Sequence, residues 1–567
     1  MPYVITQACC NDASCVAVCP VNCIHPTPDE PDFKTSEMLY IDPEGCIECG
    51  ACVDPCPVDA IVLDSDLTET TERYADLNAN YYLDPTHQDY PDTPYEPRKP
   101  QVQVSEPGPL RVAVVGSGPA GAYVAEELLT NGCVEVEVHL FERLPTPWGL
   151  VRYGVAPDHQ STKSVTNRFA RTAGRAGIDF YLNVEVGKHI THDELIAHHH
   201  AVVYTVGAPH GRDLGIPGEN LPGSHSATEF VAWYNGHPDF ADRSFDLSGE
   251  RAVVIGNGNV ALDIARILAS DTERLKRTDI ADHALEALAR SNVTEVVVLG
   301  RRGPAQAAFT LPELLGLASA TDFDVAAHPT GAEIDPLTAA VLASDPYSMA
   351  GLKAKTIAEL VSRRPTGSGK RIVLRFLGCP VEIVGDDRVH GLHVARNELV
   401  ESERGRIEAQ ATAEIDHLEC GVVFKSVGYR GAALPSVPFD ESRGTIPNDR
   451  GRVVDPADGT PVTGVYAAGW IKRGPSGVIG TNKTCAAETV RAVLEDFAAG
   501  RLTEPKNSPD MLRALIEERQ PQAVDYAGWE AIDQHERNSA PDNSRPRIKL
   551  TDTSAMLKIV EISQIQG

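Results

Sequence analysis

The sequence predicts an α/β protein built on two parallel sheets, with a small cysteine-rich domain in front of them. Two strand–turn–helix units carry this prediction, one starting at Leu110 (LRVAVVGSGPAGAYVAEELL) and one at Glu250 (ERAVVIGNGNVALDIARILA). In each unit a β-branched apolar run leads into a glycine turn and then into helical periodicity. Strands that alternate with helices favour parallel sheets. The third observation is that nine of the thirteen cysteines lie between Cys9 and Cys56.

Length and charge narrow the class of protein. With 567 residues the chain is too long for one hydrophobic core, so we expect about three or four domains. No run approaches the roughly 20 apolar residues of a membrane helix, and the first residues lack the pattern of a secretory signal. We therefore expect a soluble, cytoplasmic protein without membrane insertion. A formal charge of -29 argues against nucleic-acid binding, which needs clustered Lys and Arg.

Four cysteines form the C-x2-C-x2-C-x3-C run of bacterial ferredoxins, and Pro57 follows the last of them. Close thiolates on such a loop can hold one cubane, whereas the fourth is held apart and points to a neighbouring cluster. A 4Fe-4S cluster is therefore expected, with a reciprocal fourth ligand from the cysteine that precedes Pro20. Its predicted ligands are Cys19, Cys46, Cys49 and Cys52.

A second cluster is expected from the cysteines that remain. Cys15 and Cys56 are two of its predicted ligands, and the third is either Cys9 or Cys10, with Cys9 preferred. Three ligands suit a 3Fe-4S cluster, and a 4Fe-4S cluster is the alternative. Disulfides are rare in the cytosol and structural zinc usually takes paired C-x2-C knuckles, so these two other uses of the cysteines are disfavoured.

The N-terminal segment resembles the seven-iron bacterial ferredoxins in CVAVCPVNCIHP and CIECGACVDPCPVDAI, and LTETTERYADLNANYY is similar to their C-terminal extension. The resemblance spans about residues 1–85. It implies an α+β ferredoxin-like domain in which Cys23 is not a ligand. After the extension we expect a linker, because the stretch DPTHQDYPDTPYEPRKP is rich in proline and favours extended, non-helical backbone.

The first glycine turn predicts a flavin site. Gly116, Gly118 and Gly121 form G-x-G-x-x-G between a strand and a helix, which allows a tight turn and the close approach of a pyrophosphate. The next strand, VEVEVHLFE, ends in Glu142, where a carboxylate can accept hydrogen bonds from a ribose. A carboxylate there favours an unphosphorylated adenosine, so we expect FAD. A glycine turn without a ligand is the alternative.

The second glycine turn, Gly256-Asn-Gly258-Asn-Val-Ala261, predicts a site for a second dinucleotide. Arg301 and Arg302 follow the strand VVVLG, and paired guanidiniums can form charge-assisted bonds to a 2'-phosphate. This feature selects NADP(H) over NAD(H), unless the two arginines are merely solvated. They lie farther from the glycines than the usual spacing, which an inserted helical stretch over residues 270–290 explains.

Together these residues resemble the adrenodoxin reductase family of ferredoxin–NADP reductases, which has a glutathione-reductase-like fold with two dinucleotide-binding domains. The match runs over residues 110–494 and rests on segments such as FERLPTPWGLVRYGVAPDH, GRRGPAQAAFTLPEL and GWIKRGPSGVIGTNK. The resemblance implies FAD contacts at Gly116, Ala120, Glu142, Leu150, Val186, Trp470, Gly477, Val478 and Ile479. It implies NADP(H) contacts at Asn257, Gly258, Asn259, Val260, Arg301, Arg302, Glu313 and Gly477.

Three further sets of residues are interpreted in the light of this resemblance. Gly477 is expected where the nicotinamide meets the isoalloxazine, because the missing side chain lets two rings approach. Asp158 and His159 are expected near the flavin, either in a proton-relay or orienting role or in a structural hydrogen bond. The triplet His198–His200 looks like a metal site, but it leads into the strand AVVYTVG, where residues alternate sides, and has no matching ligand set. We predict no metal there.

The predicted function is that of a ferredoxin–NADP+ reductase. NADPH gives a hydride to FAD, and single electrons then pass to the clusters and on to a ferredoxin or a cytochrome P450-type acceptor, because nicotinamides move electron pairs and clusters move single electrons. The predicted domains are a ferredoxin-like domain (1–67), its extension and linker (68–109), an FAD-binding domain (110–208 and 427–567, with the C-terminal tail) and an NADP-binding domain (209–426).

Charge and cysteine usage bear on partners and alternatives. Twelve acidic residues against one lysine give residues 1–66 a formal charge of -11, so this domain is expected to dock on a basic face, of its own reductase part or of another protein. One alternative is a relay subunit of a larger oxidoreductase. Another is a disulfide reductase, which needs a redox-active cysteine pair near the flavin. The cysteines outside the N-terminal domain are single: Cys133, Cys379, Cys420 and Cys485.

Overall fold

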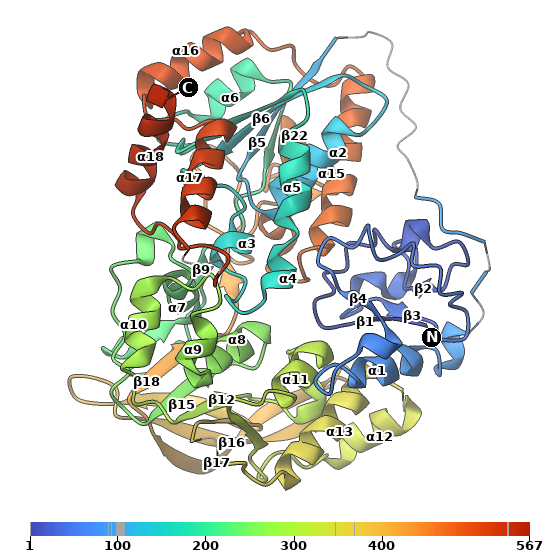
Figure 1. Ribbon diagram of the computed structural model, residues 1–567, viewed down its shortest axis with the longest axis vertical. Helices are drawn as coiled ribbons and strands as arrows, with labels where there is room; N and C mark the ends of the chain where they lie inside the picture. The colour runs from blue at the N-terminus through green and yellow to red at the C-terminus, as the bar shows by residue number, and fades with distance from the viewer. Residues whose placement is uncertain are drawn as a thin grey trace.

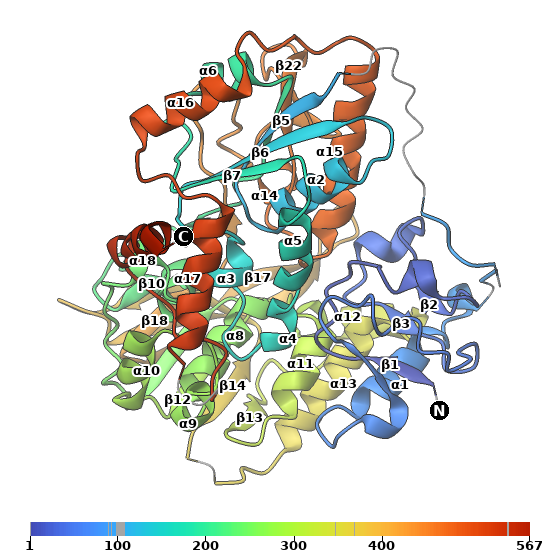
Figure 2. The same cartoon turned by 45° about the horizontal axis from the view of Figure 1, so that its top comes forward.

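The computed structural model describes residues 2–88, 90–91, 93–97, 108–345, 347–367, 369–540 and 544–566. Figure 1 shows two α/β domains, one above the other, with the N-terminal domain in blue at the side of both. In the turned view of Figure 2 the N-terminal domain again lies next to α4 (Gln160–Lys163) and α11 (Leu311–Ala318). The predicted fold class is confirmed.

The N-terminal domain is held together by two short antiparallel ladders. β1 (Tyr3–Ile5) pairs with β4 (Ile61–Leu63), and β2 (Ile24–His25) pairs with β3 (Tyr40–Ile41). The cysteine loops connect these strands, so little regular structure separates the thiols. Three 3-10 turns complete the domain: η1 (Val16–Val18), η2 (Pro31–Lys34) and η3 (Asp64–Asp66).

Helix α1 (Arg73–Tyr81) closes the N-terminal domain. The buried Asn78 side chain accepts hydrogen bonds from the amides of Ile5 (3.2 Å) and Ile41 (2.9 Å), so it ties the helix to both ladders. Beyond the helix the backbone is not extended throughout as predicted, because Asp84 caps a 3-10 turn, η4 (Pro85–His87). Residues 98–107 of the predicted linker lie outside the described residues.

The upper domain is built on a seven-stranded sheet with the order β20-β21-β22-β8-β5-β6-β7. Two chain segments that are far apart in sequence share this sheet, since β22 pairs in parallel with β8. The strands are β5 (Leu110–Val115), β6 (Val136–Glu142), β7 (Ile178–Leu182), β8 (Ala201–Tyr204), β20 (Asn448–Asp449), β21 (Arg452–Val454) and β22 (Pro461–Ala467). The helices are α2 (Pro119–Leu129), α3 (Leu150–Tyr153), α4 (Gln160–Lys163), α5 (Thr166–Ala173), α6 (His192–His198), α14 (Trp470–Arg473) and α15 (Thr481–Ala498).

The lower domain is built on a six-stranded, wholly parallel sheet with the order β10-β18-β11-β12-β14-β13. A strand covered on both faces is a continuous apolar run, as β12 shows in EVVVL, which is buried along its whole length. The strands are β10 (Ser224–Ser226), β11 (Arg251–Ile255), β12 (Glu295–Leu299), β13 (Asp324–Ala327), β14 (Arg371–Arg375) and β18 (Val422–Lys425). The helices are α7 (Ala227–Tyr234), α8 (Asn259–Ala269), α9 (Thr272–Leu275), α10 (Asp282–Ala289), α11 (Leu311–Ala318), α12 (Pro336–Ser344) and α13 (Met349–Ser362), with the turns η5 (Pro238–Phe240) and η6 (Pro304–Gln306).

Two smaller sheets complete the lower half of the molecule. An antiparallel sheet has the order β15-β16-β17, and the two-stranded ladder of β9 and β19 lies where the chain passes between the domains. Their bounds are β9 (His210–Gly211), β15 (Gly378–Val384), β16 (Gly391–Glu401), β17 (Ile407–Glu419) and β19 (Tyr429–Arg430). Within the described part of the chain, every helix is too short or too polar to cross a bilayer.

The C-terminal tail, for which the sequence predicts no role, contains three helices: α16 (Pro509–Arg519), α17 (Tyr526–Asn538) and α18 (Thr553–Gln566). In Figure 1 these red helices lie along one side of the upper domain and reach down to the lower one. The chain between α17 and α18 therefore bridges the two domains.

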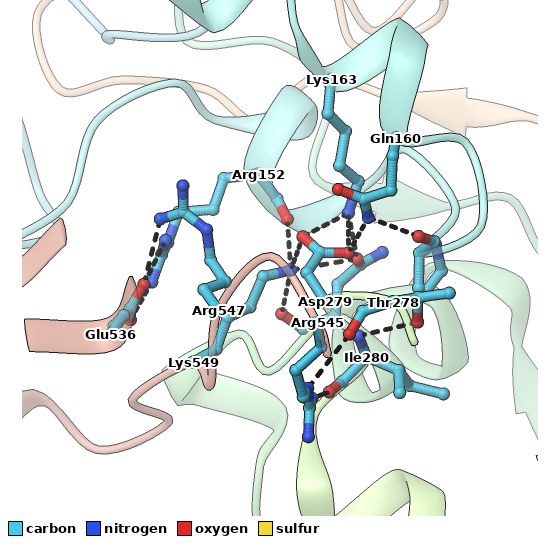
Figure 3. Close-up of polar contacts among 12 residues, drawn as sticks. Arg152, Gln160, Lys163, Thr278, Asp279, Ile280, Glu536, Arg545, Arg547 and Lys549 are labelled. Atoms are coloured by element: carbon cyan, nitrogen blue, oxygen red, sulfur yellow. Dashed lines mark hydrogen bonds and ion pairs between the residues drawn. The ribbon is translucent and has the colours of Figure 1, made fainter. Parts of the chain in front are cut away.

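A buried network of charges fixes this bridge (Figure 3). Arg152 of α3 donates two hydrogen bonds to the fully buried Glu536 of α17 (2.9 and 2.5 Å). Lys549, with a side chain that is 1% exposed, pairs with Asp279 of the lower domain (2.9 Å) and donates to the Arg152 carbonyl (3.0 Å). Asp279 also pairs with Lys163 of α4 (2.8 Å). The tail thereby locks the upper domain to the lower one.

Loss of the Glu536 charge is expected to destabilise the protein strongly. In Glu536→Gln the Arg152 guanidinium stays buried without its counter-charge, which costs about 3–5 kcal/mol of unfolding free energy. Denaturant unfolding measures this difference. The control is Glu530→Gln in the same helix, where the carboxylate is exposed and the same change is expected to cost about 0.5 kcal/mol or less. Equal stability of the two variants would contradict the role of this network.

Candidate functional site

The first glycine turn is a nucleotide cradle in which glycine is required at two positions. Gly116 has φ +102°, and a Cβ there would lie 2.8 Å from the Thr205 carbonyl oxygen. A Cβ on Gly121 would lie 2.0 Å from the Gly116 oxygen, so helix and turn pack backbone to backbone. At Gly118 the nearest atom to a Cβ is 3.9 Å away, which leaves open space in front of the helix. That space fits a pyrophosphate.

Residues from distant segments surround this cradle. Glu142, at the end of β6 as predicted, accepts hydrogen bonds from the amide (3.1 Å) and hydroxyl (2.8 Å) of Ser117. Gly469 lies against Ala120, since a Cβ on it would stand 2.5 Å from the Ala120 Cβ, and this contact brings the turn that begins α14 at Trp470 to the cradle.

The remaining predicted FAD contacts are apolar residues and one glycine. Leu150 begins α3 with 44% of its side chain exposed, which suits a residue that covers an apolar ring of a cofactor. Gly477, Val478 and Ile479 lead into α15, with Gly477 at φ +78°. Val186 lies in the turn after β7 and bridges to Ile190.

The second glycine turn repeats the cradle in the lower domain. Gly256 has φ +117°, and a Cβ would lie 2.1 Å from the Ser426 oxygen, whereas the space around Gly258 is open. The buried Asn257 Nδ2 has no hydrogen-bond partner among the described residues, so a donor is available for a ligand. Asn259 accepts a bond from the Thr310 amide (2.8 Å) and so joins α8 to the start of α11. Val260 is half-buried in the first turn of α8.

The paired arginines lie beside this second cradle. Gly300 contacts Asn257, and Arg301 and Arg302 follow it with exposed side chains. The Arg301 carbonyl accepts a bond from Asn397 (2.7 Å), so the backbone is fixed while both guanidiniums make no hydrogen bond or ion pair with the described residues. The predicted helical insertion is confirmed by α9 and α10.

Asp158 and His159 lie at the junction of the two domains. Arg266 of α8 donates to Asp158 (2.6 and 3.2 Å). Burial alone raises the pKa of Asp158, but Arg266 outweighs burial and holds that pKa well below its usual range. The His159 Nε2 lies 4.0 Å from the Glu313 carboxylate. Asp263 completes a group with His159 and Glu313, but Arg266 contacts both carboxylates (2.7 and 3.9 Å) and already supplies a positive charge.

The cysteines of the N-terminal domain fall into two sets. We call Cys19, Cys46, Cys49 and Cys52 the outer set and Cys9, Cys15 and Cys56 the inner set. The outer set lines one cavity, together with Cys23, whose sulfur lies 3.5 Å from that of Cys19. In the inner set, burial raises the pKa of Cys15 well above its usual value, and the nearby Cys9 and Cys56 raise it further. A group of buried thiols whose anions repel one another fits a cationic cluster.

Neither disulfides nor a single zinc ion fits this arrangement. All thirteen cysteines are within the described residues, and all are free thiols. Zinc at about 2.3 Å from each ligand brings sulfur atoms within about 4 Å of one another. Among the described residues no three cysteine sulfurs lie within 4.8 Å of one another. In any three of the described cysteine sulfurs, at least one pair is therefore farther apart than one zinc ion allows.

The histidine triplet has separate partners instead of a shared centre. His198 ends α6, and its Nδ1 bonds the Glu194 carbonyl (2.7 Å). His199 contacts His139 (2.8 Å), and His200 accepts a bond from the Arg111 amide (3.0 Å).

A polar hollow lies at the other end of the lower sheet. It is lined by Arg251, Glu295 and Arg371, near the amino ends of β11, β12 and β14. Arg251 and Arg371 both bond Glu295, so these charges satisfy one another. Ligands of parallel sheets bind at the carboxyl ends of the strands, and the two glycine cradles are at those ends.

The N-terminal domain is seated on both nucleotide domains. On the lower domain, Gln7 donates to Glu313 (3.0 Å) and Glu37 pairs with Lys353 (2.5 Å). On the upper domain, Asp12 pairs with Arg168 (2.9 Å). Two of these contacts thus pair an acidic residue of the N-terminal domain with a basic residue of the reductase part.

Comparison with known proteins gives the family. Residues 110–298 match the family described as pyridine nucleotide-disulphide oxidoreductase, and residues 39–62 match the 4Fe-4S binding domain. A Mycobacterium bovis protein named probable ferredoxin/ferredoxin–NADP reductase is 51% identical over 572 residues, which cover 98% of this chain and 94% of that protein. The chain belongs to the ferredoxin/ferredoxin–NADP reductase family. It is an oxidoreductase, and the predicted resemblance is confirmed.

Relatives that lack the N-terminal domain show where the reductase part lies. The structure of Mycobacterium tuberculosis FprA in complex with NADPH is 44% identical, covers 80% of this chain and 100% of that chain, and has a TM-score of 0.75. The mitochondrial NADPH:adrenodoxin oxidoreductase of Salvelinus fontinalis is 40% identical and covers 79% of this chain and 91% of that protein.

Several residues that join the domains of this reductase were not predicted from the sequence. Arg266 lies with Asp263 in the otherwise apolar helix NVALDIARILA, and a buried charge in such a helix needs partners, which was a usable signal. Gln7, Arg168 and Lys353 join the N-terminal domain to the rest, and nothing local in the sequence marks them.

The two glycines of the first cradle are expected to respond differently to alanine. Gly121→Ala places a methyl group 2.0 Å from a backbone oxygen and should lower the Tm of the apoprotein by several degrees. Gly118→Ala fits the apoprotein but fills the open space, so the Tm should be unchanged while the affinity for FAD falls. Thermal unfolding of the flavin-free protein and titration with FAD distinguish the two. Full FAD affinity in Gly118→Ala would contradict a pyrophosphate site there.

Proposed function

We propose that the chain is a self-contained ferredoxin–NADP reductase in which electrons from NADPH reach iron–sulfur clusters in its own N-terminal domain and then a separate ferredoxin or P450-type acceptor. The observation that carries the proposal is that the loop between Cys9 and Cys15 lies against the segment that leads from Gly477 into α15, where the Gly480 amide donates to the Cys10 carbonyl (2.7 Å). When bound, FAD accepts the hydride of NADPH and gives its electrons up singly. The chain's own residues bind, orient and shield the groups that react.

The upper cradle is the proposed FAD site. The backbone at Gly118 and the amino end of α2 hold the pyrophosphate, and Glu142 accepts bonds from the adenosine ribose. Glu142 already accepts two hydrogen bonds from Ser117, so its carboxylate is held in position. The further predicted contacts are Gly116, Ala120, Gly121, Leu150, Val186, Trp470, Gly477, Val478 and Ile479.

The lower cradle is the proposed NADP(H) site. The unpartnered Asn257 amide and the open space at Gly258 support it, and Arg301 and Arg302 bind the 2'-phosphate. The further predicted contacts are Asn259, Val260, Glu313 and Gly477.

Asp158 and His159 are proposed to orient the reacting groups at the domain junction. Asp158 is bound to Arg266 as an ion pair, so it stays ionised and is a poor proton carrier. The His159 Nε2 faces the Glu313 carboxylate at 4.0 Å. Hydride transfer itself needs no side-chain acid, so positioning is the role that the geometry supports.

The outer set is proposed to hold a 4Fe-4S cluster and the inner set a second cluster, of the 3Fe-4S type or, with Cys10 or another ligand added, the 4Fe-4S type. Cys9 is proposed as the third ligand of the inner set in preference to Cys10. Thirteen free thiols suit a reducing compartment, and we assign the protein to the cytoplasm. The proposed domains are those predicted from the sequence: residues 1–67, 68–109, 110–208, 209–426 and 427–567.

Removal of both arginines is expected to abolish the preference for the phosphorylated coenzyme. Each charge-assisted bond contributes about 1.5–3 kcal/mol, so Arg301→Ala/Arg302→Ala should lower kcat/KM for NADPH by about 100-fold and leave that for NADH nearly unchanged. Steady-state reduction of ferricyanide with each coenzyme measures the ratio. Arg404→Ala, an exposed arginine between β16 and β17, is the control. An unchanged ratio would show that the two arginines are only solvated.

Anaerobic stopped-flow mixing with NADPH tests the internal electron path. Flavin absorbance is expected to bleach first, and the EPR signals of freeze-quenched clusters should change afterwards. Clusters that stay oxidised while the flavin turns over with an external acceptor would contradict an internal relay, and would point instead to a separate electron-accepting partner.

A further inference from the structure

The loop of residues 10–14 lies directly against the segment that follows Gly477. The Gly480 amide donates to the Cys10 carbonyl (2.7 Å). A Cβ on Gly480 would stand 2.3 Å from both the Cys10 oxygen and the Asp12 amide nitrogen. Gly480 has φ -68° and ψ -22°, which any residue adopts, so close approach and not backbone conformation requires glycine here. The two backbones touch with no side chain between them.

Buried charges hold this loop in place. Asp12 is 6% exposed, and its carboxylate accepts a bond from Arg168 (2.9 Å). Lys483 of α15 donates to the Asp12 carbonyl (2.9 Å) and to the Ser14 hydroxyl (3.1 Å). Arg168 is itself fixed by three further bonds to Glu126 (2.7, 2.9 and 3.2 Å). Since a buried charge needs its partners, this contact has one favoured geometry.

A second anchor lies at the other end of the inner set. The Ser164 hydroxyl donates to the Pro57 carbonyl (2.8 Å), and Pro57 directly follows Cys56. The inner set is therefore attached to the upper domain on both sides, through Cys10 and through Pro57.

The outer set faces away from the reductase part. None of the hydrogen bonds and ion pairs described between residues 2–97 and the rest of the chain involves Cys46, Cys49 or Cys52. Cys49 is exposed, and its neighbour Ile47 is 58% exposed. The two sets thus have different surroundings: the inner set lies next to the proposed flavin-binding segment, and the outer set includes the exposed Cys49.

We propose that electrons pass through the two cysteine sets in a fixed order, inner set first and outer set second, and that Asp12 is the positioning residue that seats the inner set. The inference rests on the proposed function. One NADPH and two oxidised clusters give NADP+, one proton and two singly reduced clusters, so two sets that each take one electron balance one hydride. The outer set is then the outlet to the acceptor protein.

Two variants and one control test the proposed order of electron transfer and the role of Asp12. All three are made in the full-length, cofactor-loaded protein. Gly480→Ala wedges the loop away from α15, and Asp12→Asn removes the charge that Arg168 holds. Arg73→Gln, the control, breaks the exposed pair of Arg73 with Glu359 (3.2 Å), which joins the same two parts of the chain far from Gly480. Flavin content and full reduction of both clusters by dithionite confirm that each variant is loaded.

The first measurement is hydrogen exchange of residues 10–14 and 478–484. Exchange is expected to rise in Gly480→Ala and Asp12→Asn and to stay unchanged in Arg73→Gln. The second is freeze-quench EPR after mixing with NADPH. In the unmodified protein the inner-set signal should change before the outer-set signal. Both variants should slow the inner-set change by about tenfold or more, with the rate of flavin bleaching within about twofold of normal.

The outcomes separate this inference from the proposed function. Clusters that remain oxidised in the unmodified protein while the flavin is bleached would overturn both. An outer-set signal that changes first would overturn only the order. Faster exchange in the two variants without any slowing of cluster reduction would overturn the positioning role of Asp12.

Discussion

The contact of the residue 10–14 loop with Gly480 is the constraint on which the rest of the molecule depends. A flavin site and a cluster domain can exchange electrons only when they are held close together, and here the closeness is obtained by letting two backbones touch. That is why a glycine stands at the amino end of α15 although its backbone conformation does not demand one. The ion pair of Asp12 with Arg168 then selects one orientation for this contact.

Each junction between domains contains at least one buried ion pair. Asp12–Arg168 joins the N-terminal domain to the upper domain, Asp158–Arg266 joins the upper domain to the lower one, and Arg152–Glu536 attaches the tail. Desolvation offsets most of the attraction in such pairs, so they add little net stability, but loss of one partner is costly. Their contribution is to define the relative position of domains that carry different cofactors.

The features that the sequence predicted are those fixed by local backbone geometry. The glycine turns at Gly116 and Gly256 and the strand end at Glu142 follow from short-range sterics, and the structure has them at the predicted places. The C-x2-C-x2-C-x3-C run is equally local. Arg266, Asp12 and Glu536 were not found, because each acts through a partner more than a hundred residues away and no spacing rule connects them.

Because the acidic domain and the reductase part belong to one chain, long-range electrostatic attraction is not needed to bring them together. A free ferredoxin relies on long-range attraction between exposed charges, which salt screens within about 10 Å at 0.1 M ionic strength. Within one chain the linker supplies a high effective concentration, so encounter no longer limits docking. The charges at the contact can therefore be few and buried, as Asp12 is, because they select a geometry and are not needed to capture a partner.

Most of the formal charge of -11 stays on the outside of the N-terminal domain. In the proposed electron path, this charge steers a second protein toward the exposed Cys49 and Ile47.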